Sequence, residues 1–280
     1  MEDFKDFCFN TYGYELDNND HILFPDDRRA HELSADVKHI FHPAKNNLFM
    51  LEALCHYLTM DKWIPAVLDP MAGAGSILAG AKHCDSMVLI ELGEYFSQQI
   101  AINISKMDLS RKVYFMPKTD CVEGMKQIVD DSITATIFSP PYADQLQKRK
   151  GTKVYDDENN TAGKGIKNYA FEHKRNISNM AQFQFNQIMK AFYKEVYRVT
   201  QPMGFVCCII KDRMKDGKRV GYGVEQARWA YQAGFSPYQW HQRYAVGSIF
   251  GTWNRKQGIA QVEDEHIIIM QKRVKQNGQQ

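Results

Sequence analysis

The stretch that decides the fold reads Val67-Leu68-Asp69-Pro70-Met71-Ala72-Gly73-Ala74-Gly75-Ser76. It begins with a short apolar run typical of a buried strand and continues through a turn that contains two glycines. Glycines there allow backbone N–H groups at a helix N-terminus to contact a ligand. We therefore expect a strand, a tight turn and a helix capped by Ser76, with the turn either binding a ligand or serving structure alone.

The chain on both sides of this stretch alternates strand-like runs with helical ones. Apolar periodicity predicts a helix at 47–58, strands at 66–69, 87–91, 113–116 and 133–138, and helices that start at 76 and cover 94–104. Further along it predicts helices at 185–199 and 224–233, a buried strand at 204–211, and strands at 238–244 and 266–271. Such alternation is typical of an α/β protein with a parallel doubly wound sheet. The last two strands, which no long helix separates, should pair antiparallel.

The length and composition fit one α/β domain with insertions better than two small domains. The chain has 280 residues, of which 44% are hydrophobic, and no apolar run approaches the roughly twenty residues that span a bilayer. No basic start followed by an apolar stretch marks a secretory signal, so we expect a cytoplasmic protein of bacterial, archaeal or phage origin. Six cysteines lack the spacing of metal ligands and are expected to be reduced core residues.

Acidic residues follow the next two predicted strands. Glu91 ends its strand roughly twenty residues after the glycines, where a carboxylate accepts hydrogen bonds from ribose hydroxyls, although a surface carboxylate is also compatible. Asp120 could accept from the amino group of an adenine, and the Cys121 N–H could donate to its ring nitrogen. Three strand ends in register predict a nucleoside pocket. A triphosphate is disfavoured because no Walker-type lysine follows the glycines, whereas a dinucleotide site stays open.

A second motif, Ser139-Pro140-Pro141-Tyr142, follows the predicted strand at 133–138. Adjacent prolines fix φ and cannot donate to a sheet ladder, so the strand must stop there and hold its end groups rigidly. Taken alone, the motif is compatible with a stiff turn. Rigid acceptors beside an aromatic ring also suit the amine of a flat nitrogenous base.

In combination these motifs resemble the S-adenosylmethionine-dependent amino-methyltransferases of DNA, specifically those with a Ser-Pro-Pro-Tyr motif that methylate the N4 amine of cytosine. The resemblance covers roughly residues 39–272, and its motifs in chain order are His42-Pro43-Ala44-Lys45, the stretch from Asp69 to Gly75, Glu91, Asp120 and Ser139–Tyr142. It implies a Rossmann-like seven-stranded sheet, mostly parallel with an antiparallel last strand and helices on both faces. It also implies that residues 42–45 and the glycine turn hold the methionine end of the cofactor, Glu91 the ribose and Asp120 the adenine.

The chemistry explains why this motif suits amine methylation. A base amine is a poor nucleophile because its lone pair is delocalised, so acceptors for its hydrogens favour the geometry needed for attack. The Ser139 hydroxyl and the Pro140 carbonyl are candidate acceptors, held rigidly by Pro141, and Tyr142 would stack on a flipped base. In the family, serine at the first position favours cytosine over adenine. Methylation at C5 is set aside because no proline precedes a cysteine, and the mechanism requires no metal.

Basic residues gather in two segments beyond the motif. Residues 144–180 form a candidate target-recognition insertion in which aromatic residues alternate with cations, among them Lys148, Arg149, Lys150, Lys153, Lys174 and Arg175. A solvated charge run is the alternative. A second basic turn follows the strand at 204–211 and is a candidate DNA clamp through Arg213, Lys215, Lys218 and Arg219. The segment 247–256 either contacts DNA as well or packs on the core through Trp253.

The sequence thus predicts an N-terminal arm at 1–45 that holds one short helix, a catalytic domain at 46–272 and a tail at 273–280. The expected function is site-specific methylation of a flipped cytosine at N4 in double-stranded DNA, with a cognate restriction endonuclease or specificity partner as a potential partner. Recognition is expected to use internal loops or such a partner, because no long recognition domain follows the last strand. An adenine-N6 enzyme of DNA, an RNA amino-methyltransferase and a non-catalytic module that binds cofactor and nucleic acid remain alternatives.

Overall fold

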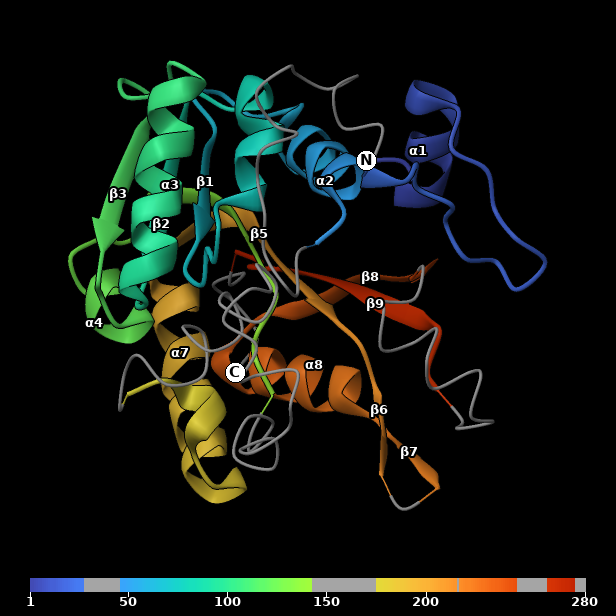
Figure 1. The fold of residues 1–280 in the computed structure, drawn as a ribbon. Helices are drawn as coiled ribbons and strands as arrows, with labels where there is room; N and C mark the ends of the chain where they lie inside the picture. Colours follow the sequence, from blue (N-terminus) through green and yellow to red (C-terminus); the bar gives the residue numbers. More distant parts are fainter. Residues whose placement is uncertain (28–45, 143–174, 216, 246–260, 275–280) are drawn as a thin grey trace, which may run out of the picture.

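The computed structural model describes residues 1–27, 46–142, 175–215, 217–245 and 261–274 (Figure 1). Within them, seven strands form one sheet in the order β3-β2-β1-β4-β5-β9-β8. Their bounds are β1 Ala66–Asp69, β2 Ser86–Glu91, β3 Val113–Pro117, β4 Ile133–Phe138, β5 Thr200–Ile210, β8 Ser236–Tyr244 and β9 Asp264–Gln271. Strands β1 to β5 pair in parallel, and β9 runs antiparallel to both β5 and β8. The predicted fold is confirmed, including the antiparallel pairing of the last two strands.

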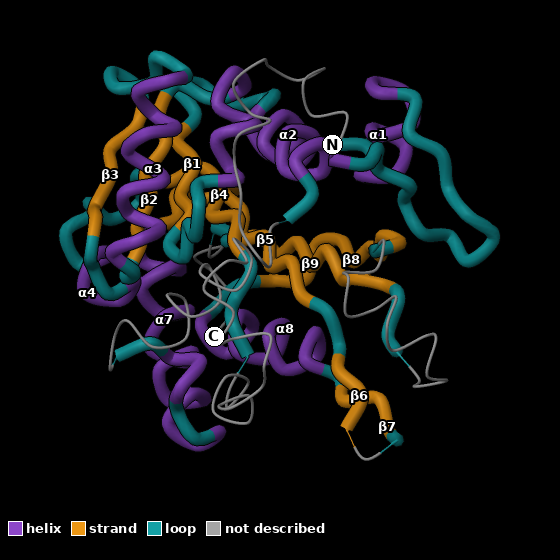
Figure 2. Tube along the Cα trace, viewed as in Figure 1, coloured by secondary structure: helices purple, strands orange, loops and turns teal. Residues whose placement is uncertain are grey.

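Helices cover both faces of the sheet (Figures 1 and 2). One face packs against α1 Phe4–Tyr12, α2 Leu48–Thr59, the 3-10 helix η3 Ser76–His83 and α3 Glu94–Lys106. The other packs against α4 Cys121–Met125, α7 Gln182–Val199 and α8 Tyr222–Ala233, with the short 3-10 helix η5 Ile177–Asn179 ahead of α7. A hairpin of β6 Arg213–Lys215 and β7 Lys218–Val220 leaves the end of β5. The sheet therefore separates two apolar cores, one against each set of helices.

The central strands are apolar on both faces because both faces are covered. Every residue of β4 is buried, as are the last seven of β5, which is the pattern expected for parallel strands between two helical layers. Helix α2 is buried along almost its whole length, since it lies between the sheet, α1 and η3. Gly80 of η3 permits this packing, because a Cβ there would stand 2.4 Å from the sulfur of Cys55.

The first residues of the chain belong to the packed body of the molecule. Helix α1 is the short helix expected in residues 1–45, and its side chains of Phe4, Phe7 and Cys8 are buried in the same core as α2. The backbone N–H of Phe4 donates to Oε1 of Gln239 on β8 at 3.1 Å. The backbone N–H of Ile22 donates to the carbonyl of Gln242 on the same strand. Residues 28–45 of the expected arm lie outside the described residues.

In the part of the chain that the structure describes, no helix is both long and apolar enough to cross a membrane.

Burial of α1 predicts different effects for two phenylalanines on the same helix. Phe4→Ala should lower the free energy of unfolding by about 3–5 kcal/mol, because it removes a fully buried ring. Phe9→Ala should change it by less than about 0.5 kcal/mol, because that ring is 60% exposed. Urea denaturation of the two variants checks this, and equal effects would show that α1 is not part of the core.

Candidate active site

The strands deliver their carboxyl ends to one edge of the sheet, where the predicted motifs meet. Strands β1 and β4 are neighbours, with Val67 opposite Ala135 and Leu68 opposite Thr136. The glycine turn follows β1 and the Ser139–Tyr142 motif follows β4 at the same edge. After β1 the chain crosses over one face through η3, and after β4 it crosses over the other through α7. This divergence is the topological switch point at which open α/β sheets bind ligands.

The glycine turn is held in a defined shape by the neighbouring strand and helix. The Ala72 N–H donates to the Ile90 carbonyl at 3.0 Å, and the Asn103 side chain donates to the Ala74 carbonyl at 3.0 Å. Gly73 and Gly75 adopt φ values of 52° and 80°, in the region that favours glycine. Hydrogen bonds from β2 and α3 and the two glycines therefore define the shape of this turn.

The prediction that Ser76 caps the following helix is wrong. Gly75 occupies the N-cap position with no side-chain cap, and the helix that starts at Ser76 is of the 3-10 type. A Cβ at Gly75 would stand 3.2 Å from Leu78, so the close approach of this turn to its own helix also requires glycine. Ser76 itself is buried at the start of η3.

The two acidic residues predicted to bind a nucleoside lie at the ends of β2 and β3. Glu91 ends β2, and its carboxylate accepts from the backbone N–H groups of Gly73 at 2.8 Å and Gly93 at 2.6 Å. It thus braces the glycine turn, a role that was not predicted from the sequence. Asp120 caps α4 through Oδ1, which accepts from the N–H groups of Val122 and Glu123. Among the described residues, Oδ2 of Asp120 accepts no hydrogen bond.

Burial perturbs two groups on this side of the site. Asp69 ends β1 and is only 8% exposed. Burial, and secondarily the charge of Glu91, raise the pKa of Asp69 to about 7, against a single opposing hydrogen bond from the Met71 N–H. Burial also raises the pKa of the Cys121 thiol, so it remains protonated at neutral pH.

The Ser139–Tyr142 motif emerges between the two strand ends. Pro140 is buried, whereas Ser139, Pro141 and Tyr142 are partly exposed. The Tyr142 hydroxyl donates to the carbonyl of Lys211 at 2.6 Å and accepts from its N–H at 3.0 Å. Lys211 directly follows β5, so this reciprocal pair joins the ends of β4 and β5. Burial raises the pKa of Tyr142, and its phenol is therefore neutral at physiological pH.

Two further residues enclose the Tyr142 ring, and neither was predicted from the sequence to do so. The ring of Tyr222, at the start of α8, meets it edge-on at 5.2 Å between centroids. The guanidinium of Arg213 lies 5.9 Å from its centroid. Position along the chain could have predicted these contacts, because Lys211 and the hairpin follow a strand that ends beside the motif.

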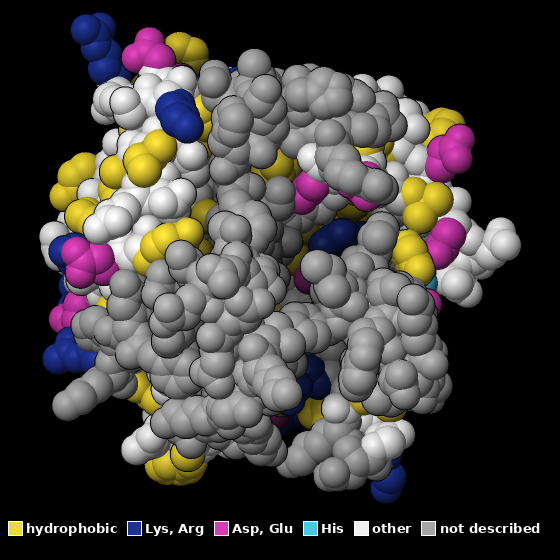
Figure 3. Space-filling model, viewed as in Figure 1, with side chains coloured by type: hydrophobic (Ala, Val, Ile, Leu, Met, Phe, Trp, Pro, Cys, Tyr) yellow, Lys and Arg dark blue, Asp and Glu magenta, His cyan; other side chains and the backbone are white. Residues whose placement is uncertain are grey.

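The predicted nucleic-acid contacts have different outcomes. Five of them lie outside the described residues, namely Lys148, Arg149, Lys150, Lys153 and Lys174. The predicted cofactor-binding residues His42, Pro43, Ala44 and Lys45 also lie outside the described residues. Arg175 is described and exposed just ahead of η5, and Lys218 is exposed on β7. Lys215 ends β6 on the same hairpin. On the described surface of the face shown in Figure 3, basic and acidic side chains lie next to one another, so charge alone does not mark a nucleic-acid surface there.

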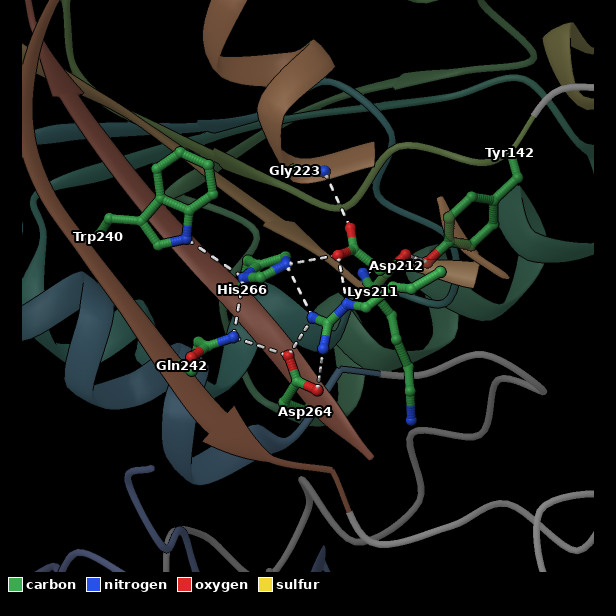
Figure 4. Close-up of polar contacts among 9 residues, drawn as sticks. Tyr142, Lys211, Asp212, Gly223, Trp240, Gln242, Asp264 and His266 are labelled. Atoms are coloured by element: carbon green, nitrogen blue, oxygen red, sulfur yellow. Dashed lines mark hydrogen bonds and ion pairs between the residues drawn. The ribbon is translucent and has the colours of Figure 1, made fainter. Parts of the chain in front are cut away.

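The phosphate contact of Arg219 stays a prediction, and its guanidinium also has partners within the protein. Its guanidinium is committed to Asp212 and Asp264, two carboxylates of the protein itself (Figure 4). Sequence reasoning missed this because Asp264 is 45 residues away along the chain.

Among the described residues, no group of three or more His, Cys, Asp or Glu side chains could hold a metal ion.

Comparison with known proteins supports the fold. No protein-family model matches the chain, and no curated protein matches it. Among solved structures, the [4+2]-cyclase SpnF is similar at 14% identity and a TM-score of 0.50, over 80% of each chain. TrmN from Thermus thermophilus is similar at 13% identity and a TM-score of 0.50, over 90% of this chain and 55% of that one. The described residues have the Rossmann-like fold of methyltransferases.

The raised pKa of Asp69 predicts how stability depends on pH. Because the folded pKa of about 7 exceeds the ordinary 3.8, the folded state binds more protons in this interval. The free energy of unfolding should therefore fall as pH rises toward 7, with a slope of at most about 1.4 kcal/mol per pH unit from this group. Asp69→Asn should flatten the slope between pH 5 and 7 in urea titrations, whereas Asp61→Asn, at an exposed site, should not. An unchanged slope in Asp69→Asn would contradict the assignment.

Proposed function

We propose that the protein is an S-adenosylmethionine-dependent amino-methyltransferase of nucleic acid, and that its target is the N4 amine of a flipped cytosine in double-stranded DNA. The observation that carries the proposal is the meeting of two motifs at one switch point. The glycine turn with Glu91 and Asp120 lies on the β1-to-β3 side, and Ser139–Tyr142 lies on the adjoining strand end. A cofactor pocket and a base pocket would then share a wall formed by the ends of β1 and β4.

The residues on the first side fit this cofactor. When bound, S-adenosylmethionine supplies a methyl group on a positively charged sulfur, together with a positively charged amino group. Asp69 is a buried carboxyl whose pKa is raised to about 7, and a nearby cation would favour its ionised form. Oδ2 of Asp120 is open for an adenine amine, since both of its cap bonds use Oδ1. The Glu91 carboxylate already orders the glycine turn, and from the same position it would also accept hydrogen bonds from ribose hydroxyls.

The residues on the second side fit amine chemistry. The Ser139 hydroxyl and the Pro140 carbonyl would accept hydrogen bonds from the amine hydrogens, which localises the nitrogen lone pair for in-line attack. The Ser139 hydroxyl is partly exposed, so a base can reach it. Tyr142 offers a ring face for the flipped base, and such a contact contributes about 1–3 kcal/mol toward the few kcal/mol that extrusion costs.

The choice of cytosine in DNA as the target is the more specific part of the proposal. It rests on the resemblance of Ser139–Tyr142 to the cytosine-N4 enzymes and on the basic segments beyond the motif. Lys218 and Arg175 are exposed in the described part of the chain, and the insertion at 144–180 carries the predicted phosphate contacts. A cognate restriction endonuclease or specificity partner would supply sequence recognition in this proposal.

The direct test is to identify the methylated product. The purified protein is incubated with labelled S-adenosylmethionine and unmethylated bacterial genomic DNA, and the digested nucleosides are analysed by mass spectrometry. Labelled N4-methyldeoxycytidine is the expected result. N6-methyldeoxyadenosine would overturn the choice of base and leave the reaction class, and label that appears only in an RNA substrate would overturn the choice of nucleic acid. No label in either polymer would contradict the proposed function.

The acceptor role predicts a selective effect of Ser139→Ala. The single-turnover rate of methyl transfer should fall by roughly 100-fold, because one hydrogen-bonding group is lost at the reacting centre. Cofactor affinity by calorimetry should stay within about twofold, because Ser139 faces the base and not the glycine turn. The matched control is Ser132→Ala, which lies just before the other end of β4 and should leave both quantities unchanged. A normal rate for Ser139→Ala would exclude the acceptor role.

The proposed insertion predicts a change in salt dependence. Replacing Lys148, Arg149 and Lys150 by alanine should weaken DNA binding and reduce the slope of log K against log[salt] by about 1 for each phosphate that is no longer neutralised. Replacing Lys106 and Arg111, exposed at the opposite edge of the sheet, should leave the slope unaltered. Fluorescence anisotropy at several salt concentrations measures the affinity and the slope. If the triple variant has the same slope as the wild-type protein, the insertion is a solvated charge run and not a DNA contact.

A further inference from the structure

One continuous segment, residues 211–222, surrounds Tyr142. Its first residue, Lys211, exchanges two hydrogen bonds with the Tyr142 hydroxyl through its backbone. Arg213, two residues on, places its guanidinium over the ring, and Tyr222 closes the segment against the edge of the same ring. The hairpin β6–β7 lies between these contacts. The position of Tyr142 therefore depends on the path of this segment.

Arg219 fastens the segment at two points. Its Nε donates to Oδ2 of Asp212 at 2.8 Å, within the segment itself. Its Nη1 and Nη2 donate to the two carboxylate oxygens of Asp264, the first residue of β9, in a bidentate pair. Figure 4 labels Asp212 and Asp264, the two acids that this guanidinium joins. One side chain thus ties the return strand of the hairpin both to its own start and to the sheet.

Asp212 is in turn fixed from the other side. Its Oδ1 accepts from the N–H of Gly223 on α8 at 3.2 Å, and its Oδ2 lies 3.1 Å from Nε2 of His266. The indole N–H of Trp240 can only donate, and it lies 3.2 Å from Nδ1 of His266. Nδ1 is therefore the acceptor, and Nε2 carries the hydrogen that binds Asp212. The close packing of α8 against His266 also requires glycine at position 223, since a Cβ on Gly223 would stand 2.8 Å from the His266 ring.

The balance of charges makes Arg219 the critical member of this cluster. The side chains of Asp212 and Asp264 are only 7% and 11% exposed, whereas that of Arg219 is 43% exposed. Burial raises the pKa of each carboxyl, but hydrogen bonds led by Arg219 outweigh it, so the pKa of both acids lies below the ordinary value. Removal of Arg219 would leave two buried carboxylates without their cation, which costs far more than the loss of a surface pair.

We propose that Arg219 is a positioning residue for Tyr142. It holds residues 211–222 against β9 and α8, and so fixes the Lys211 peptide that orients the tyrosine hydroxyl and the two side chains that enclose its ring. The inference rests on the proposed function only for what Tyr142 contacts, a flipped base. The mechanical link from Arg219 to Tyr142 stands on the contacts alone.

Hydrogen exchange tests the link without any assay of activity. The N–H of Lys211 donates to Tyr142, so its exchange rate reports on that bond. In Arg219→Gln and in Tyr142→Phe, this amide should exchange at least about tenfold faster, relative to amides in the middle of β4. Arg198→Gln is the matched control, because Arg198 binds Glu195 and Asp130 at the opposite edge of the sheet. It should lower stability without a selective effect at Lys211, and unchanged Lys211 exchange in Arg219→Gln would overturn the proposal.

Kinetics test the consequence for the site. Arg219→Gln should lower kcat about tenfold or more with little change in KM for the cofactor, and Arg219→Lys should recover part of it, because lysine can pair with only one of the acids. Since both act on the same ring, the double variant with Tyr142→Phe should be no slower than the worse single variant. Additive losses, or a normal kcat despite faster exchange at Lys211, would overturn the positioning role. If the wild-type protein transfers no methyl group, the proposed function fails and the exchange experiment still decides whether the link exists.

Discussion

The divergence of the chain after β1 and β4 is the constraint on which the rest of the structure depends. These strands are hydrogen-bonded neighbours, yet their crossovers, η3 and α7, cover opposite faces of the sheet. The two segments that follow must therefore separate at this sheet edge, which is where open α/β sheets bind ligands. The braced glycine turn borders this point on one side, and the enclosed tyrosine borders it on the other.

Local sequence predicted the fold because each parallel strand is an apolar run bounded by turn residues, as at Ile133–Phe138 before the two prolines. It also predicted which residues stand at strand ends, since these depend only on where each run stops. The burial of α1 was missed although Phe4, Phe7 and Cys8 have helical spacing, because the charged residues Lys5 and Asp6 lie between them and polar runs follow. The partner of Arg219 could not be predicted, since Asp264 approaches it only through the antiparallel return of β9.

The buried carboxyls on the β1 side and on the β5 side of this sheet edge differ in whether a cation compensates them. On the β1 side, Asp69 is buried with few hydrogen bonds, so its charge is costly and its pKa is raised to about 7. On the β5 side, Asp212 and Asp264 are buried as well, but Arg219 compensates them and keeps their charges stable. An uncompensated carboxyl suits a site where a cationic ligand supplies the missing charge, whereas a compensated pair suits a structural lock.

The enclosure of Tyr142 limits what that residue can contribute to the proposed reaction. Its hydroxyl both donates to and accepts from the Lys211 peptide, and burial raises its pKa, so it is neither a proton acceptor nor a mobile donor. What remains for a base is the part of the ring that Tyr222 and Arg213 leave uncovered. Under the proposed mechanism, the amine hydrogens must then be received by the Ser139 hydroxyl and the Pro140 carbonyl, whose geometry is set by the end of β4 and by the prolines. In this proposal, the tyrosine would fix where the base lies, and the serine and proline would determine how its nitrogen reacts.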